Sequence, residues 1–173
     1  MNAARRGRPT FGPQTTVPRH GTLFAAVAFA SFAAVAAALA TQHMWGMEPC
    51  PWCVLQRLIF VAIGVAALLG LAWRGAAGSR FVAGLGLLLA LAGIAAALWQ
   101  HFVAARSPSC NLTLADKIVN ATELNRVLPD VFEARASCAD AAVSLVGVPY
   151  AFWAALVFLA CAIALVRVLQ ARV

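Results

Sequence analysis

Charge is the scarcest property of this chain. Only 11% of its 173 residues are charged and only six are acidic, whereas 63% are hydrophobic. Soluble domains carry about 25% charged residues, so this composition excludes an ordinary soluble domain. The formal net charge is +7, but no run of basic residues is interleaved with aromatic ones. Nucleic acid is therefore not a predicted partner.

The five cysteines lack the surroundings that two common kinds of cysteine site require. Cys50 and Cys53 form a C-x-x-C pair. A zinc site would need a second close pair, but Cys110 and Cys138 are far apart in the sequence. A thioredoxin-like domain would need a β-α-β frame, which this chain lacks. The C-x-x-C pair is therefore interpreted as a redox-active pair, with an inert disulfide or half of a zinc site as the alternatives.

Long apolar runs are what the chain has in abundance. Four of them occur, at residues 21–40, 54–73, 81–101 and 149–167. Because about 20 apolar residues can span a bilayer as a helix, we predict an all-α membrane protein with a four-transmembrane-helix bundle. Residues 1–20 form a basic arm ahead of it. A cleaved signal peptide ending at Ala40 is the rival interpretation of the first run, but this run is longer than the ~7–15 residues of a signal h-region.

Basic and acidic residues are segregated between the two sides of these predicted spans. One side would hold eight basic residues and no acidic one: Arg5, Arg6, Arg8, Arg19, Arg74, Arg80, Arg167 and Arg172. The opposite loops, at about 41–53 and 104–148, would hold all six acidic residues: Glu48, Asp116, Glu123, Asp130, Glu133 and Asp140. The positive-inside rule then predicts cytoplasmic N- and C-termini. It places Cys50, Cys53, Cys110 and Cys138 on the outer, oxidising side, where disulfides persist.

The segment from Cys50 to Arg57 combines a strained cysteine pair with a charge. Pro51 suits the first position of a helix and disfavours a helical conformation at the residue before it, so Cys50 is predicted to cap the helix. A thiolate near a helix N-terminus is stabilised by the dipole, which suits electron exchange. Arg57 lies four residues after Cys53, on the same helix face. It either reaches out to lipid headgroups or anchors an electron-rich ligand beside Cys53.

Two further features carry weaker signals. Apolar residues recur with helical spacing between residues 114 and 132, which predicts a helical segment lying on the membrane surface or packed on the bundle. Cys161 lies in the middle of the fourth run and is predicted to be a packing residue.

The order of these motifs resembles the DsbB family of bacterial disulfide-generating membrane proteins. The resemblance covers about residues 21–168, with C-x-x-C and Gln56-Arg57 opening the second span and a second cysteine pair between spans three and four. Gln42-His43 and Gln100-His101 also echo family positions, whereas the spacing of Gly147 and Pro149 departs from the family pattern. The vitamin K epoxide reductase family is the alternative, but its C-x-x-C comes near the end of the bundle.

The resemblance implies a path for electrons. Cys110 and Cys138 would form the loop disulfide that oxidises a periplasmic DsbA-like dithiol protein, and Cys110 would be the sulfur attacked. Electrons would then pass to Cys50 and Cys53, and from Cys53 to ubiquinone or menaquinone, as in the DsbA–DsbB–quinone chain of the bacterial periplasm. Arg57 and His101 would contact the quinone. The protein would lie in the bacterial inner membrane.

Two other classes of function remain open from the residues alone. A cysteine-liganded metal or haem protein of the membrane would lose its metal on chelation. A structural membrane protein, with disulfides that only brace its loops, would have cysteines that never turn over.

Overall fold

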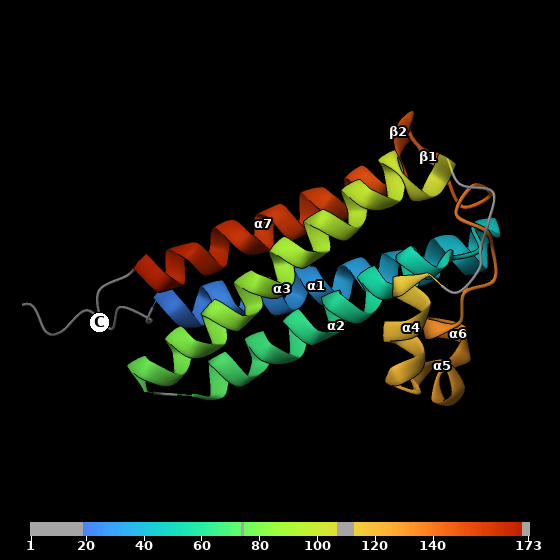
Figure 1. The fold of residues 1–173 in the computed structure, drawn as a ribbon. Helices are drawn as coiled ribbons and strands as arrows, with labels where there is room; N and C mark the ends of the chain where they lie inside the picture. Colours follow the sequence, from blue (N-terminus) through green and yellow to red (C-terminus); the bar gives the residue numbers. More distant parts are fainter. Residues whose placement is uncertain (1–18, 74, 107–112, 171–173) are drawn as a thin grey trace, which may run out of the picture.

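Four long helices form the body of the molecule. The computed structural model describes residues 19–73, 75–106 and 113–170. The helices lie side by side and run along the length of the molecule (Figure 1). They are α1 (Arg19–Trp45), α2 (Pro51–Ala72), α3 (Ala76–Phe102) and α7 (Tyr150–Gln170). Helix α1 packs against α2 and α7, and α3 packs against the same two helices. The prediction of an all-α, four-helix architecture is confirmed.

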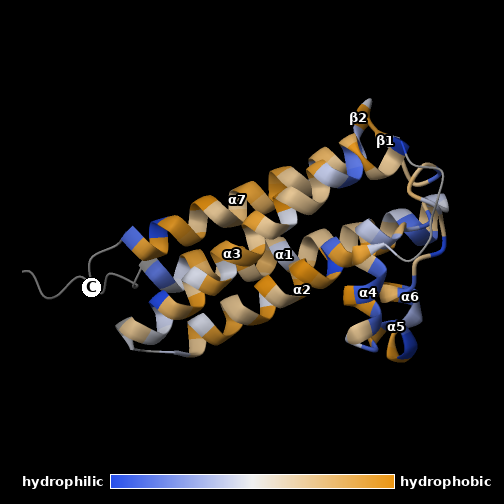
Figure 2. Cartoon of the chain, in the orientation of Figure 1, coloured by the Kyte–Doolittle hydropathy of each residue, from blue (hydrophilic) through white to orange (hydrophobic). Residues whose placement is uncertain are grey.

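Each of these four helices is long and apolar enough to cross a membrane. Hydrophobic residues cover most of their length, and hydrophilic residues gather toward their ends (Figure 2). A helix satisfies its backbone hydrogen bonds internally, which is what a segment in hydrocarbon requires. The fold is therefore that of a membrane helix bundle.

The first helix extends further than its apolar run. We expected the span to end near Ala40 and a loop to begin at Thr41, but α1 continues to Trp45. Thr41 is 9% exposed and donates from Oγ1 to the carbonyl of Ala38 at 2.9 Å, while Gln42 is 4% exposed and hydrogen-bonds inside the bundle. These polar side chains find partners in the protein, so they do not end the helix.

Aromatic stacking joins three helices in the interior. The rings of Phe60 in α2 and Phe158 in α7 are stacked, with centroids 3.8 Å apart and planes at 2°. Phe158 is fully buried, and its ring lies where a side chain at Gly93 of α3 would otherwise stand. Gly93 thus permits the close approach of α3 and α7.

The connection between α3 and α7 folds into short elements at one end of the bundle (Figure 1). The described part contains η1 (Ala104–Arg106), α4 (Leu114–Ala121), α5 (Leu124–Val127), α6 (Pro129–Phe132), and an antiparallel hairpin of β1 (Ser144–Leu145) and β2 (Val148–Pro149).

The helical pattern of residues 114–132 is divided rather than continuous. Glu123 adopts the left-handed conformation (φ 55°), which ends the first helical stretch. Leu128 precedes Pro129 and leaves the helical region (φ −133°, ψ 67°), because a proline disfavours the α conformation before it. Helix α4 packs on α2 and buries Ala115 and Val119. Of the two predicted positions, on the membrane surface or packed on the bundle, α4 therefore has the second.

Candidate active site

The two cysteines of C-x-x-C lie at the N-terminus of α2. Cys50 is the N-cap residue with extended backbone (φ −84°, ψ 169°), and Pro51 opens the helix. The Cys50 sulfur accepts a hydrogen bond from the backbone N–H of Cys53 at 3.3 Å and lies 2.8 Å from the Cys53 sulfur. The predicted helix cap is confirmed. Both residues are thiols here, with Cys50 fully buried and Cys53 half-buried.

Cys138 reaches Cys50 from the long connection. The two residues pack in one small buried cluster, where the thiols of Cys50 and Cys138 interact. Cys138 is only 4% exposed. A sulfur from the loop therefore lies next to the first sulfur of the C-x-x-C pair.

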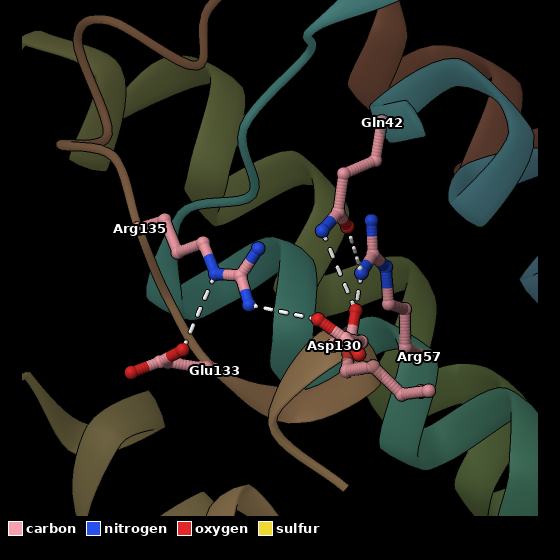
Figure 3. A network of polar contacts seen from close by, with 6 residues as sticks. Gln42, Arg57, Asp130, Glu133 and Arg135 are labelled. Carbon is pink, nitrogen blue, oxygen red and sulfur yellow. Dashed lines mark hydrogen bonds and ion pairs between the residues drawn. The ribbon is translucent and has the colours of Figure 1, made fainter. Parts of the chain in front are cut away.

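Backbone contacts hold this part of the loop in place. The carbonyl of Pro49 accepts hydrogen bonds from the backbone N–H groups of Arg135 and Ala136, at 2.9 and 3.2 Å. The Arg135 guanidinium in turn contacts Asp130 at 3.0 Å and Glu133 at 3.2 Å (Figure 3). Residues 135–136, which come shortly before Cys138, are thus hydrogen-bonded to Pro49, the residue that precedes Cys50.

The contact between Cys50 and Cys138 distributes charge unequally. The hydrogen bond to Cys138, then the one to Cys53 and burial, raise the pKa of the Cys50 thiol far above its usual range. The same hydrogen bond from Cys50 lowers the pKa of Cys138, although burial opposes this. In the reduced protein, a negative charge is therefore favoured on the Cys138 sulfur over the Cys50 sulfur, and the thiolate is the nucleophilic form of cysteine.

Arg57 is buried inside the bundle rather than extended toward its surface. Its residue exposure is 5%. The guanidinium donates to the side chain of Gln42 at 2.8 Å (Figure 3). It also donates to the backbone carbonyls of Val131 and Ala38, at 3.1 and 3.3 Å. Its Nε–H has no hydrogen-bond partner. Since the charged head points into protein, these contacts argue against the snorkelling alternative.

Two buried glutamines connect to Cys53. Gln100 of α3 donates from Nε2 to the Cys53 sulfur at 3.1 Å, and Gln56 of α2 donates from Nε2 to Gln100 Oε1 at 2.6 Å. They are 4% and 5% exposed. Both glutamines belong to the motifs that resemble the DsbB family, but neither was predicted to have a role of its own. The signal that could have found them is an uncharged amide within an apolar span, which needs a partner when buried.

An apolar cavity of about 270 Å³ opens beside Cys53 and Arg57. Helix α1, helix α2, the start of α7 and the hairpin all contribute to its wall. The Thr41 and Tyr150 hydroxyls, 3.2 Å apart, lie at its edge. The acidic residue Glu48 also lines the cavity. Further lining residues are Ala34, Ala37, Ala38, Met47, Pro49, Gln56, Phe60, Ala141, Val143, Leu145, Trp153, Ala154 and Val157. The cavity is suited to a mostly apolar molecule with a polar group.

The remaining predicted residues lie elsewhere. His101 packs against Phe152 and Phe102, with ring centroids 4.7 and 4.9 Å away, and is not among the residues that line the cavity. Its site role stays a prediction. Cys110 lies outside the described residues. Cys161 is buried in the core, 3.9 Å from the Ser31 hydroxyl, so it has one polar neighbour that we had not expected.

Metal ligands were the other chemistry considered for the cysteines. Within residues 19–73, 75–106 and 113–170, no three or more His, Cys, Asp or Glu side chains are grouped so that they could hold a metal ion.

Comparison with known proteins identifies the family. The profile of the DsbB family, described as disulfide bond formation protein DsbB, matches residues 20–168. A protein named disulfide bond formation protein B from Ralstonia nicotianae is 38% identical over 132 residues, which are 75% of this chain and 81% of the relative. Proteins of the same name from Herminiimonas arsenicoxydans and an Azoarcus species are 33% and 36% identical, each over 82% of this chain and over 90% and 87% of their own lengths. No solved structure matches the chain. This four-helix membrane protein belongs to the DsbB family of disulfide bond formation proteins.

Proposed function

We propose that this protein reoxidises a periplasmic DsbA-like dithiol protein and passes the electrons through two cysteine pairs to a membrane quinone. One observation carries the proposal. Cys53 contacts Cys50, which packs beside Cys138 of the loop. Cys53 also lines the apolar cavity, together with Arg57. Electrons arriving from the loop side can therefore leave on the membrane side through a single residue.

The first step takes place on the loop. A thiolate of the partner attacks a disulfide between Cys110 and Cys138, and the second partner thiol resolves the mixed disulfide. The partner becomes a disulfide and the two loop cysteines become thiols, so two electrons enter the protein. Cys110 as the attacked sulfur rests on the resemblance to the family.

The second step joins the two pairs. The Cys138 thiolate attacks the sulfur of Cys50 in a Cys50–Cys53 disulfide. A bond forms between Cys138 and Cys50, the bond to Cys53 breaks, and its electron pair stays on the Cys53 sulfur. The contact of Cys138 with Cys50 supports this order, because it places the loop sulfur next to the first sulfur of the C-x-x-C pair. Attack by Cys110 on Cys138 restores the loop disulfide and returns Cys50 as a thiol.

The cavity beside Cys53 fits the head of a quinone. Its wall is mostly apolar, and the unpartnered Nε–H of Arg57 supplies a donor for a carbonyl oxygen. Cys50 and Cys53 would form their disulfide again by giving up two electrons and two protons, for which a quinone held there would be the acceptor. Arg57 would favour the negative charge that develops on the oxygen, because a buried cation acts strongly in an apolar surrounding. The residues fit ubiquinone and menaquinone alike.

The sidedness completes the proposal. We place the described short elements α4, α5, α6 and the hairpin in the periplasm, and both termini in the cytoplasm of a bacterial inner-membrane protein. The segregation of basic and acidic residues supports this arrangement.

A direct assay tests this function. Purified protein is mixed with a reduced DsbA-type dithiol protein and ubiquinone-1, and quinone reduction is followed by absorbance. We expect reduction that depends on protein and dithiol, and that is abolished in Cys53→Ser and in Cys138→Ser. Cys161→Ser serves as the matched control, because that buried thiol hydrogen-bonds Ser31 and is not among the residues that line the cavity, and it should retain the rate. Unchanged reduction in Cys53→Ser would contradict the proposal.

A further inference from the structure

A chain of two buried amides ends on the sulfur that we propose to pass electrons to quinone. Gln56 in α2 donates to Gln100 in α3 at 2.6 Å, and Gln100 donates to the Cys53 sulfur at 3.1 Å. We infer that Gln100 is a positioning residue that stabilises negative charge on the Cys53 sulfur, and that Gln56 fixes the orientation in which it does so. The role rests on the proposed function, since it acts when Cys53 becomes the leaving sulfur.

The chemistry follows from which end of the amide faces the sulfur. A carboxamide has a donor end and an acceptor end. Only the N–H end stabilises a sulfur anion, whereas the oxygen end would repel it. A hydrogen bond to a charged group stabilises more than one between neutral groups, and burial at 4% exposure strengthens it further.

Gln56 decides which end Gln100 presents. The Nε2 group of Gln56 donates a hydrogen bond to the side-chain oxygen of Gln100. The N–H₂ group of Gln100 therefore faces Cys53. Turning the Gln100 amide around would place two donors against each other and an oxygen against the sulfur. Gln56 is itself 5% exposed and lines the cavity beside Cys53, so the pair is held between two packed helices.

The arrangement also separates the two sulfurs of the C-x-x-C pair. Cys50 receives its N–H donor from the helix backbone, whereas Cys53 receives one from a side chain on another helix. A side-chain donor can be removed by substitution without altering the turn that holds the pair. This makes the inference testable.

The test measures Cys53 reactivity without quinone. The reduced full-length chain in detergent micelles is treated with iodoacetamide at pH 7, and labelling of Cys53 is followed by fragment mass spectrometry. We expect Gln100→Met to slow alkylation about tenfold, the lower limit for a hydrogen bond to a charged group. Gln100→Glu should slow it further, because both ends of a carboxylate are acceptors. Gln56→Met should slow it about threefold, because Gln100 then keeps its donor but loses its fixed orientation.

Controls separate this role from mere helix packing. Ser31→Ala removes another buried polar side chain, one that hydrogen-bonds Cys161, and should leave Cys53 alkylation unchanged. A packing role would alter thermal unfolding in Gln100→Met and Gln100→Glu without slowing alkylation well below the unfolding temperature. Alkylation within twofold of the unsubstituted chain in Gln100→Met would overturn the inference. If Gln100→Met does not accumulate, an unchanged rate in Gln56→Met has the same force.

Failure of this inference is distinct from failure of the proposed function. If Cys53→Ser still reduces quinone, the electron path is wrong, whatever the alkylation rates are. If Cys53→Ser is inactive and Cys53 in Gln100→Met is alkylated at the normal rate, the electron path stands and the role of Gln100 is wrong. In the quinone assay, we expect Gln100→Met to lower kcat and to leave the quinone KM unchanged.

Discussion

Arg57 Nη1 donates a hydrogen bond to the backbone carbonyl of Val131 at 3.1 Å, which joins the interior of α2 to the short helix α6. The same guanidinium lines the apolar cavity beside Cys53. One buried cation therefore contacts both the loop that carries Cys138 and the proposed quinone cavity. Its bond to Gln42, whose own amide donates to the Asp130 carbonyl at 3.4 Å, strengthens the connection (Figure 3).

Removing this cation should affect binding and the loop together. We expect Arg57→Ala to raise the apparent quinone KM about tenfold, because one hydrogen bond to a charged group is lost. Amide hydrogen exchange in α6 should also become faster, since Val131 loses its donor. Arg57→Lys keeps the charge but lacks the planar guanidinium with its fixed donor geometry, so it should recover only part of both effects. An unaltered KM in Arg57→Ala would remove Arg57 from the quinone site.

The reactivity of Cys138 should depend on Cys50. The hydrogen bond from Cys50 lowers the pKa of Cys138, so its thiolate persists as the pH falls below about 8.5, the ordinary value for a thiol. In the reduced protein, we expect the midpoint of Cys138 alkylation against pH to lie below that value and to move upward in Cys50→Ala. Cys50→Ser retains a hydroxyl donor and should move the midpoint less. A midpoint that is equal in all three proteins would show that the Cys50 thiol does not lower the pKa of Cys138.

Packing at Gly93 should be intolerant of even one methyl group. A Cβ there would collide with the buried ring of Phe158, which is stacked on Phe60. We expect Gly93→Ala to destabilise the bundle by about 1–3 kcal/mol, measured by thermal or denaturant unfolding in micelles. Gly84→Ala is the matched control, because a Cβ at position 84 of the same helix meets nothing within 4 Å. Equal stabilities of the two variants would show that α3 and α7 can separate without cost.

The hairpin turn is strained at Val146. Val146 (φ 55°) and Gly147 (φ 79°) are both in the left-handed region, and Val146 is 88% exposed. Asparagine tolerates this conformation, whereas a β-branched residue is disfavoured there by about 1–2 kcal/mol. Val146→Asn should therefore raise the unfolding temperature or leave it unchanged, and Val146→Ile should not raise it. A lower unfolding temperature in Val146→Asn would mean that the apolar tip makes a stabilising contact.

The sequence by itself determined the architecture. Four apolar runs predict four membrane helices, because a long apolar segment in lipid has no alternative to a helix. The cap at Cys50 could also be predicted, since Pro51 acts on its immediate neighbour through local sterics. These features depend on residues that are close together in the chain, where composition and backbone geometry are sufficient.

The tertiary structure alone decided which side chains meet. The contacts of Cys138 with Cys50, of Val131 with Arg57 and of Gln100 with Cys53 join residues far apart in the sequence. The sequence drew attention to His101 at the end of α3, but its neighbour Gln100 contacts the cysteine. Adjacent residues of a helix point about 100° apart, so the rotation of α3 against α2 selects one of them. That rotation is set by packing along the whole helix pair, including the close approach at Gly93, and no local pattern encodes it.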